Sequence, residues 1–324
     1  IRGNIGADTM DGGTGTDTLN YQDSSSGVTI DLVNNTASGG SATGDVISGF
    51  ENVVGSSYDD VIRSNSDSTL IQGGYGDDTL ISYFSLSNTL FEGNEGDDIL
   101  GFGVTGGLAG IFSTPVTFDG GTDTDTLTFE IFNSDFTVDF LSGRMFLTSD
   151  PAFYVTLMRI KNITAGGGDD VLIGKTGANE ISGGAGDDII QGNAGADILD
   201  GGADIDTLDY RDSTAGVTID LHTHAASGGT AQGDVISNFE NVIGSSYDDV
   251  IRGNFDTTLI QGGYGDDELI NYFSLSDAVF EGNEGDDMIG FGLVGGLEGS
   301  FATPATFDGG ADTDTLTFEV FAND

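Results

Sequence analysis

Aspartate recurs at a fixed spacing along this chain. From Ala165 to Asp209 it takes the sixth place of glycine-rich nine-residue segments, with Asn179 in the second of them: AGGGDDVLI, GKTGANEIS, GGAGDDIIQ, GNAGADILD and GGADIDTLD. Glycines at the first, second and fourth places allow positive φ and leave carbonyl oxygens uncovered. Carboxylate and carbonyl oxygens are the ligands that a hard cation such as Ca²⁺ prefers. The segments therefore predict several calcium ions, bound in successive turns.

The candidate metal ligands are the sixth-place aspartates, within this block and in the segments outside it. They are Asp8, Asp17, Asp60, Asp78, Asp98, Asp125, Asp170, Asp188, Asp197, Asp206, Asp249, Asp267, Asp287 and Asp314. Other segments depart from the pattern: Asp123, Asp204, Asp312, Tyr58 and Tyr247 replace the fourth-place glycine, and Thr69 and Thr258 replace the aspartate. We expect these departures to weaken or abolish binding in the turns where they occur.

The last three residues of each segment alternate in polarity, with an aliphatic residue at the eighth place. Such alternation favours a very short strand with one side chain turned inward, and stacked copies would join these side chains into a continuous core. We expect most phenylalanines to extend this core, among them Phe84, Phe91, Phe102, Phe112, Phe118 and Phe129. No stretch shows a capped 3.6-residue apolar period, so little or no helix is predicted.

The full pattern, G-G-x-G-x-D-x-U-x, resembles the RTX (hemolysin-type) calcium-binding nonapeptide repeat. The resemblance implies an all-β fold, a right-handed parallel β-roll or β-solenoid. It further implies that aspartates from successive turns, together with glycine carbonyls, hold calcium. Relatives of this kind leave the cell by type I secretion, so a secreted bacterial protein at the cell surface is expected.

The chain also repeats on a larger scale. Residues 1–135 align without gaps to residues 190–324 at an offset of 189 and are about 70% identical. Three cassettes, residues 18–53, 126–163 and 207–242, share one frame and interrupt the nonapeptides. We predict one continuous solenoid over residues 1–324, with a first repeat unit at 1–189 and a partial second unit at 190–324. Because it begins inside a repeat, we expect the chain to be a fragment of a longer protein.

The charge balance limits the possible partners. The chain has 54 acidic and 8 basic residues, a formal charge of −46, and no cysteine. About fifteen calcium ions would neutralise roughly thirty of these charges, at two per ion. Nucleic acid and anionic membranes are unsuitable partners for such a surface. No apolar run approaches the roughly 20 residues that span a bilayer, and a disulfide scaffold is excluded.

The sequence offers little that favours catalysis. Paired carboxylates such as Asp77 and Asp78 are typical of glycosidases, but a catalytic pair is a single site, whereas this pair recurs along the chain. His222 and His224 correspond to Val33 and Asn35 in the other copy, so we expect them to be exposed surface residues. We therefore predict that the chain is not an enzyme.

The sequence favours a secreted, calcium-dependent structural repeat protein, such as a component of a surface layer, extracellular fibre or adhesin stalk. Its partners would be further copies of itself, in a lattice or filament, or other cell-surface components. The alternative is the non-catalytic calcium-binding tail of a type I-secreted enzyme or toxin. A third hypothesis, polysaccharide binding, requires an exposed row of aromatic rings. The segments Ser82–Glu92 and Phe102–Asp119 depart from nine-residue spacing and are predicted contact surfaces.

Overall fold

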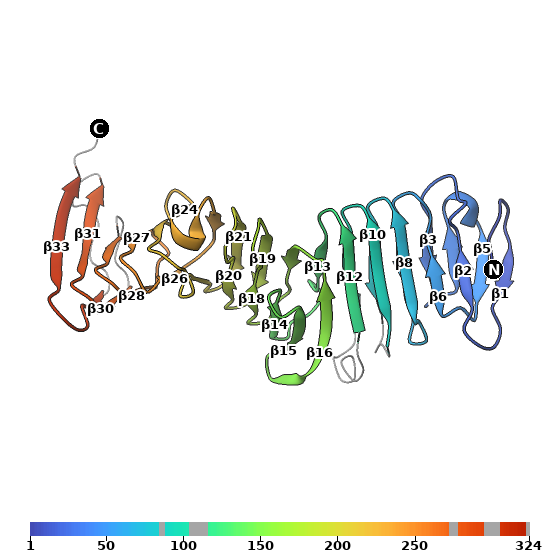
Figure 1. Ribbon diagram of the computed structural model, residues 1–324, viewed down its shortest axis with the longest axis horizontal. Coiled ribbons are helices and arrows are strands. Elements are labelled where there is room, and N and C mark those ends of the chain that lie inside the picture. Colours follow the sequence, from blue (N-terminus) through green and yellow to red (C-terminus); the bar gives the residue numbers. More distant parts are fainter. Residues whose placement is uncertain (84–87, 104–115, 272–277, 295–304, 322–324) are drawn as a thin grey trace. The chain divides into compact units, whose positions relative to one another are not determined.

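The computed structural model describes the chain except residues 84–87, 104–115, 272–277, 295–304 and 322–324 (Figure 1). It divides into two compact units, Ile1–Gly167 (unit 1) and Gly168–Asp324 (unit 2). The described residues form no α-helix; their helical segments are two short 3₁₀ turns, η1 (Gly40–Ala42) and η2 (Gly229–Ala231). No described helix is long and apolar enough to cross a membrane.

Unit 1 contains two sheets. In the order of their pairing, the strands of its sheet A are β2 (Thr18–Asn20), β6 (Asn52–Val54), β8 (Leu70–Tyr75), β10 (Leu90–Glu95), β12 (Val116–Thr122), β16 (Asp150–Met158), β15 (Arg144–Leu147) and β14 (Phe136–Asp139). Those of its sheet B are β1 (Thr9–Asp11), β5 (Asp45–Ser48), β4 (Thr36–Ser38), β3 (Thr29–Asp31), β7 (Val61–Arg63), β9 (Thr79–Ser82), β11 (Ile99–Phe102), β13 (Thr126–Thr128) and β17 (Asn162–Thr164). Figure 1 shows β8, β10 and β12 side by side.

Unit 2 is built in the same way. Its sheet A consists of β18 (Val171–Ile173), β20 (Ile189–Gln191), β22 (Thr207–Asp209), β26 (Asn241–Ile243), β28 (Leu259–Tyr264), β30 (Val279–Glu284) and β32 (Thr306–Asp308). Its sheet B consists of β19 (Glu180–Ala185), β21 (Ile198–Ala203), β25 (Val235–Ser237), β24 (Ala225–Ser227), β23 (Thr218–Asp220), β27 (Val250–Gly253), β29 (Glu268–Asn271), β31 (Met288–Val294) and β33 (Thr315–Phe321).

Successive nonapeptides alternate between the two sheets, so one coil takes two of them. Leu172 pairs with Ile190 and Ile190 with Leu208, a step of 18 residues along sheet A of unit 2. These eighth-place side chains are fully buried. The prediction of an all-β roll of parallel strands is confirmed. That the coils run unbroken over residues 1–324 stays a prediction.

Aromatic side chains fill part of the core of unit 1. Phe91 and Phe118 pair in register on β10 and β12, with tilted rings whose centroids lie 5.0 Å apart, and Phe102 packs edge-on against Phe118 at 5.1 Å. Phe129 lies beside Phe136 at 5.2 Å. The prediction that these phenylalanines form core is confirmed for the described ones.

Part of the sequence prediction lies outside the described residues. Phe84 and Phe112 belong to the ranges that the structure does not describe, as do most residues of the two predicted contact surfaces, 82–92 and 102–119. Contact through these surfaces stays a prediction.

The cassettes introduce the antiparallel strands of the described chain. In the first cassette β3 pairs antiparallel with β4 and β4 with β5, and β23, β24 and β25 repeat this arrangement in unit 2. In the cassette at 126–163 the antiparallel strands are β14, β15 and β16. This cassette begins on sheet B and its hairpin lies in sheet A, whereas the other two begin on sheet A and place theirs in sheet B. The shared sequence frame therefore encodes the same set of three antiparallel strands, which lies in sheet B in two cassettes and in sheet A in the third.

The alternation on β21 predicts unequal costs for two adjacent substitutions. Leu199 is fully buried between Ile181 and Ile236, whereas Ile198 is 50% exposed. Leu199→Ala should lower the free energy of unfolding of the calcium-loaded protein by about 2–5 kcal/mol, and Ile198→Ala by about 1 kcal/mol. Denaturant titration of both variants measures this difference. Equal costs would contradict the inward orientation of the eighth place.

Candidate calcium turns

The sixth-place carboxylates stack from coil to coil. Along each stack, the backbone N–H at this place donates to a carboxylate oxygen one coil further on. Asp249 donates to Oδ1 of Asp267 at 2.8 Å, and Asp267 donates to Oδ1 of Asp287 at 2.9 Å. We call these stacks the inner ladders. In unit 1 they are Asp8–Asp45, Asp17–Glu51 and Asp60–Asp78–Asp98–Asp125. In unit 2 they are Asp170–Asp188–Asp206–Glu240, Asn179–Asp197–Asp234 and Asp249–Asp267–Asp287–Asp314.

All fourteen predicted aspartates thus lie on inner ladders, but their environments differ. Eleven of them, from Asp60 to Asp287, are buried. Asp8 and Asp17 are half-buried and Asp314 is exposed. That they bind calcium stays a prediction, and the buried members are the stronger candidates.

Four ladder carboxylates come from the cassettes and were missed by the nonapeptide pattern: Asp45, Asp234, Glu51 and Glu240. Their amino acids are identical in the two copies at the 189-residue offset, while neighbours such as Gly49 and Asn238 differ. The identity of these four residues between the two copies was the signal in the sequence that could have identified them. In the cassette at 126–163, a lysine (Lys161) takes the place of the glutamate, and its ammonium donates to a backbone carbonyl.

The fifth-place aspartates form a second row on the solvent side, the outer ladders. Here the N–H bonds run in the opposite direction, to the preceding coil: Asp187 donates to Asp169 at 3.0 Å, and Ile205 donates to Asp187 at 2.9 Å. Asp187 is exposed, whereas the adjacent Asp188 is buried. The paired carboxylates of the sequence therefore face different surroundings.

In eight inner-ladder aspartates of the described chain, the second carboxylate oxygen is buried without a hydrogen-bond donor. These Oδ2 atoms belong to Asp78, Asp98, Asp125, Asp188, Asp197, Asp206, Asp267 and Asp287. They face first-place glycines: a β-carbon on Gly183 would lie 2.2 Å from Asp188 Oδ2 and 2.4 Å from the carbonyl oxygen of Gly201 in the next coil. Only glycine leaves this space, which carboxylate and carbonyl oxygens line.

Burial changes the protonation of these groups. It raises the pKa of Asp78 and Asp267 from 3.8 to about 8, and that of Asp188 and Asp206 to about 7. Nearby carboxylates of the ladders add to the rise, because like charges disfavour ionisation. A bound divalent cation would reverse this effect by favouring the ionised form.

The residues present fit calcium. The free oxygens are carboxylate and carbonyl, which are hard ligands, and the neighbouring carboxylates supply the negative charge. Within the described ranges, no group of three or more His, Cys, Asp or Glu side chains converges on one point. A cation here would therefore draw on ladder carboxylates of successive coils together with glycine carbonyls. Calcium would supply charge neutralisation, and the chain would supply the preformed turns.

Comparison with known families agrees with this geometry. A family model for the RTX calcium-binding nonapeptide repeat, four copies long, matches residues 1–20, 162–181 and 173–208. These are RTX calcium-binding nonapeptide repeats. The chain thus carries RTX calcium-binding repeats on a β-roll, and such repeats are typical of extracellular proteins that are secreted by the type I route. A search of curated proteins found no significant match.

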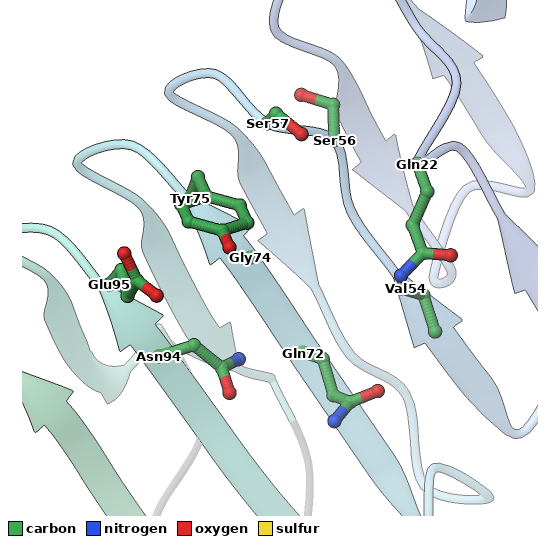
Figure 2. A pocket seen from close by; sticks show the side chains of 9 residues that line it. All are labelled: Gln22, Val54, Ser56, Ser57, Gln72, Gly74, Tyr75, Asn94 and Glu95. Carbon is green, nitrogen blue, oxygen red and sulfur yellow. The ribbon is translucent and has the colours of Figure 1, made fainter.

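The remaining candidate features of the sequence lie at the surface. His222 and His224 are exposed, as predicted. A shallow groove of about 410 Å³ crosses sheet A of unit 1, lined by Gln22, Val54, Ser56, Ser57, Gln72, Gly74, Tyr75, Asn94 and Glu95 (Figure 2). Tyr75 is the one aromatic residue among these described lining residues. The groove itself therefore lacks the aromatic row that polysaccharide binding requires.

Asp188→Ala tests the inner ladder of the RTX repeats. The variant loses a buried carboxylate and should bind about one calcium ion fewer. It should lower thermal stability more in calcium than in chelator. In both conditions the buried N–H of Asp170 loses its acceptor, Oδ1 of Asp188, but only in calcium is a bound ion lost as well. Calcium stoichiometry by equilibrium dialysis and melting with and without chelator measure both effects.

Asp187→Ala is the matched control, since it removes the adjacent exposed carboxylate. It should leave the stoichiometry unchanged. Equal stoichiometry in Asp188→Ala and the unsubstituted protein would contradict the role of the inner ladder.

The raised pKa values predict how the metal-free fold depends on pH. A carboxyl whose folded pKa lies above its unfolded value of 3.8 stabilises the fold fully below about pH 4, and this contribution is lost as pH rises through the folded pKa values of about 6 to 8. In chelator, β-structure measured by circular dichroism should therefore be greatest in acid and decline towards neutral pH. In saturating calcium the decline should disappear. A β signal that grows with pH in chelator would contradict the assignment.

Proposed function

We propose that this chain is part of a secreted structural repeat protein that folds and assembles when it meets calcium outside the cell. The product would be a surface layer, an extracellular fibre or an adhesin stalk. The chain would have no catalytic role, and its partners would be further copies of itself or other cell-surface components.

The observation that carries the proposal is the duplication of the whole construction. The inner ladder Asp60–Asp78–Asp98–Asp125 of unit 1 returns in unit 2 as Asp249–Asp267–Asp287–Asp314, with the same donors and acceptors. The cassette at 18–53, with its antiparallel strands, returns at 207–242. Tandem repetition of the same coils is what a stalk or lattice requires.

Calcium supplies the switch between the secreted and the assembled states. With 54 acidic residues against 8 basic ones, the chain repels itself when the ladders are ionised and metal-free. Extracellular modules bind calcium in the range of roughly 10⁻⁴ to 10⁻³ M, well above cytosolic concentrations. Binding and folding would therefore coincide after export.

The alternative is the calcium-binding tail of a type I-secreted enzyme or toxin. Such a tail would also fold in calcium, but it would remain a monomer. Assembly separates the two functions.

Electron microscopy of the protein before and after calcium addition tests the proposal. Chelated protein should show no ordered particles, and millimolar calcium should produce filaments or sheets that chelator dissolves. Asp188→Ala should raise the calcium concentration needed for assembly, and Asp187→Ala should not. Folded but monomeric particles in calcium would support the tail instead.

A further inference from the structure

Some inner-ladder carboxylates accept hydrogen bonds on both of their oxygens. Asp60 and Asp249 are as deeply buried as the others, but their side chains are fully hydrogen-bonded. Oδ2 of Asp60 accepts the N–H of Ser56 at 2.5 Å, and its Oδ1 accepts the Ser56 hydroxyl at 2.8 Å. The N–H of Val28 adds a third donor to Oδ1 at 2.7 Å. Asp249 has the same set from Ser245 and Val217.

In the ladders that begin at Asp60 and at Asp249, the residue at the second place of the nonapeptide separates the two kinds of turn. Where it is glycine or asparagine with positive φ, as in Gly74 (φ 130°) and Asn94 (φ 87°), the Oδ2 of the following sixth-place aspartate has no donor. Ser56 and Ser245 are not among the residues with positive φ, and their N–H groups point at the carboxylate. Lys175 behaves in the same way, donating its N–H to Asn179 at 2.9 Å.

Where a ladder ends on an aspartate of a cassette, a tyrosine hydroxyl supplies the donor instead. Oδ2 of Asp45 accepts the buried hydroxyl of Tyr21 at 2.8 Å, and Oδ2 of Asp234 accepts that of Tyr210 at 2.7 Å. Both tyrosines are almost completely buried in the cassettes that follow the nonapeptides. The hydroxyl thus reaches the oxygen that elsewhere has no partner.

We propose that these donors make metal-free turns, in which Ser56, Ser245, Tyr21 and Tyr210 occupy the position of a calcium ion and divide the ladders into separate calcium-binding runs. This inference rests on the calcium binding proposed above and adds the residues that decide which turns take an ion. A carboxylate with three donors gains little from a cation, whereas one without donors on Oδ2 is left uncompensated unless a cation binds. The second place of the repeat and the cassette tyrosine are therefore the determinants of calcium stoichiometry.

Replacing the second-place serines tests the proposal. Ser56 lies in the turn beside Ser57 (Figure 2). The double variant Ser56→Gly, Ser245→Gly restores the glycine of the full repeat and removes both hydroxyls. It should bind about two more calcium ions than the unsubstituted protein, one for each opened turn. Equilibrium dialysis against ⁴⁵Ca²⁺ at saturation measures the number.

The matched control is Ser57→Gly, Ser246→Gly, which changes the exposed third-place residues and leaves the hydrogen bonds to Asp60 and Asp249 in place. Its stoichiometry should equal that of the unsubstituted protein. A gain in the control as large as that in the second-place variant would overturn the proposal.

Tyr210→Phe provides an independent variant that keeps the ring and removes only the hydroxyl. It should bind about one additional ion, at Asp234. If neither it nor the serine double variant binds more calcium than an unsubstituted protein that does bind calcium, the proposal is wrong. If the unsubstituted protein binds no calcium, the proposed function fails instead.

Discussion

The structure depends on buried carboxylate oxygens that no donor reaches. Eight aspartates of the described chain place such an oxygen between coils, and Asp78, for example, has the carboxylates of Asp60 and Asp98 in the neighbouring coils. An ionised group in this position is costly unless it is protonated or paired with a cation. The coils can therefore stack at neutral pH only when something neutralises the ladder. Under the proposed function, calcium binding and coil stacking would therefore be one event.

Glycine makes this arrangement geometrically possible. At the first place it leaves out the β-carbon that would fill the space beside the carboxylate, as at Gly183 and Gly201. At the second place a positive φ, as at Gly184 (φ 102°), is a conformation that most other residues avoid. The turn is thus specified by an absence of side chains, and the strands that follow need only one inward aliphatic residue each.

The cassettes serve a different purpose within the same roll. Their antiparallel strands add core, including Ile30 and Ile219, without adding free carboxylate oxygens. Asp45 and Asp234 join the ladders but are hydrogen-bonded to tyrosine hydroxyls. Under the proposal, metal-dependent stretches of the roll would alternate with stretches whose polar groups the chain itself satisfies.

The sequence by itself determined the short strands of the nonapeptides, their inward eighth-place residues and the fourteen ladder aspartates, because all of these follow from a local nine-residue period. It also indicated calcium, because glycine turns with aspartate offer only oxygen ligands. The tertiary structure decided what lies far apart in sequence: that Glu51 meets Asp17 and that Tyr210 reaches Asp234. It also distinguished Asp60, which is satisfied, from Asp78, which is not. These contacts depend on which coils become neighbours, and that is set by stacking across 18 to 37 residues rather than by the pattern within one repeat.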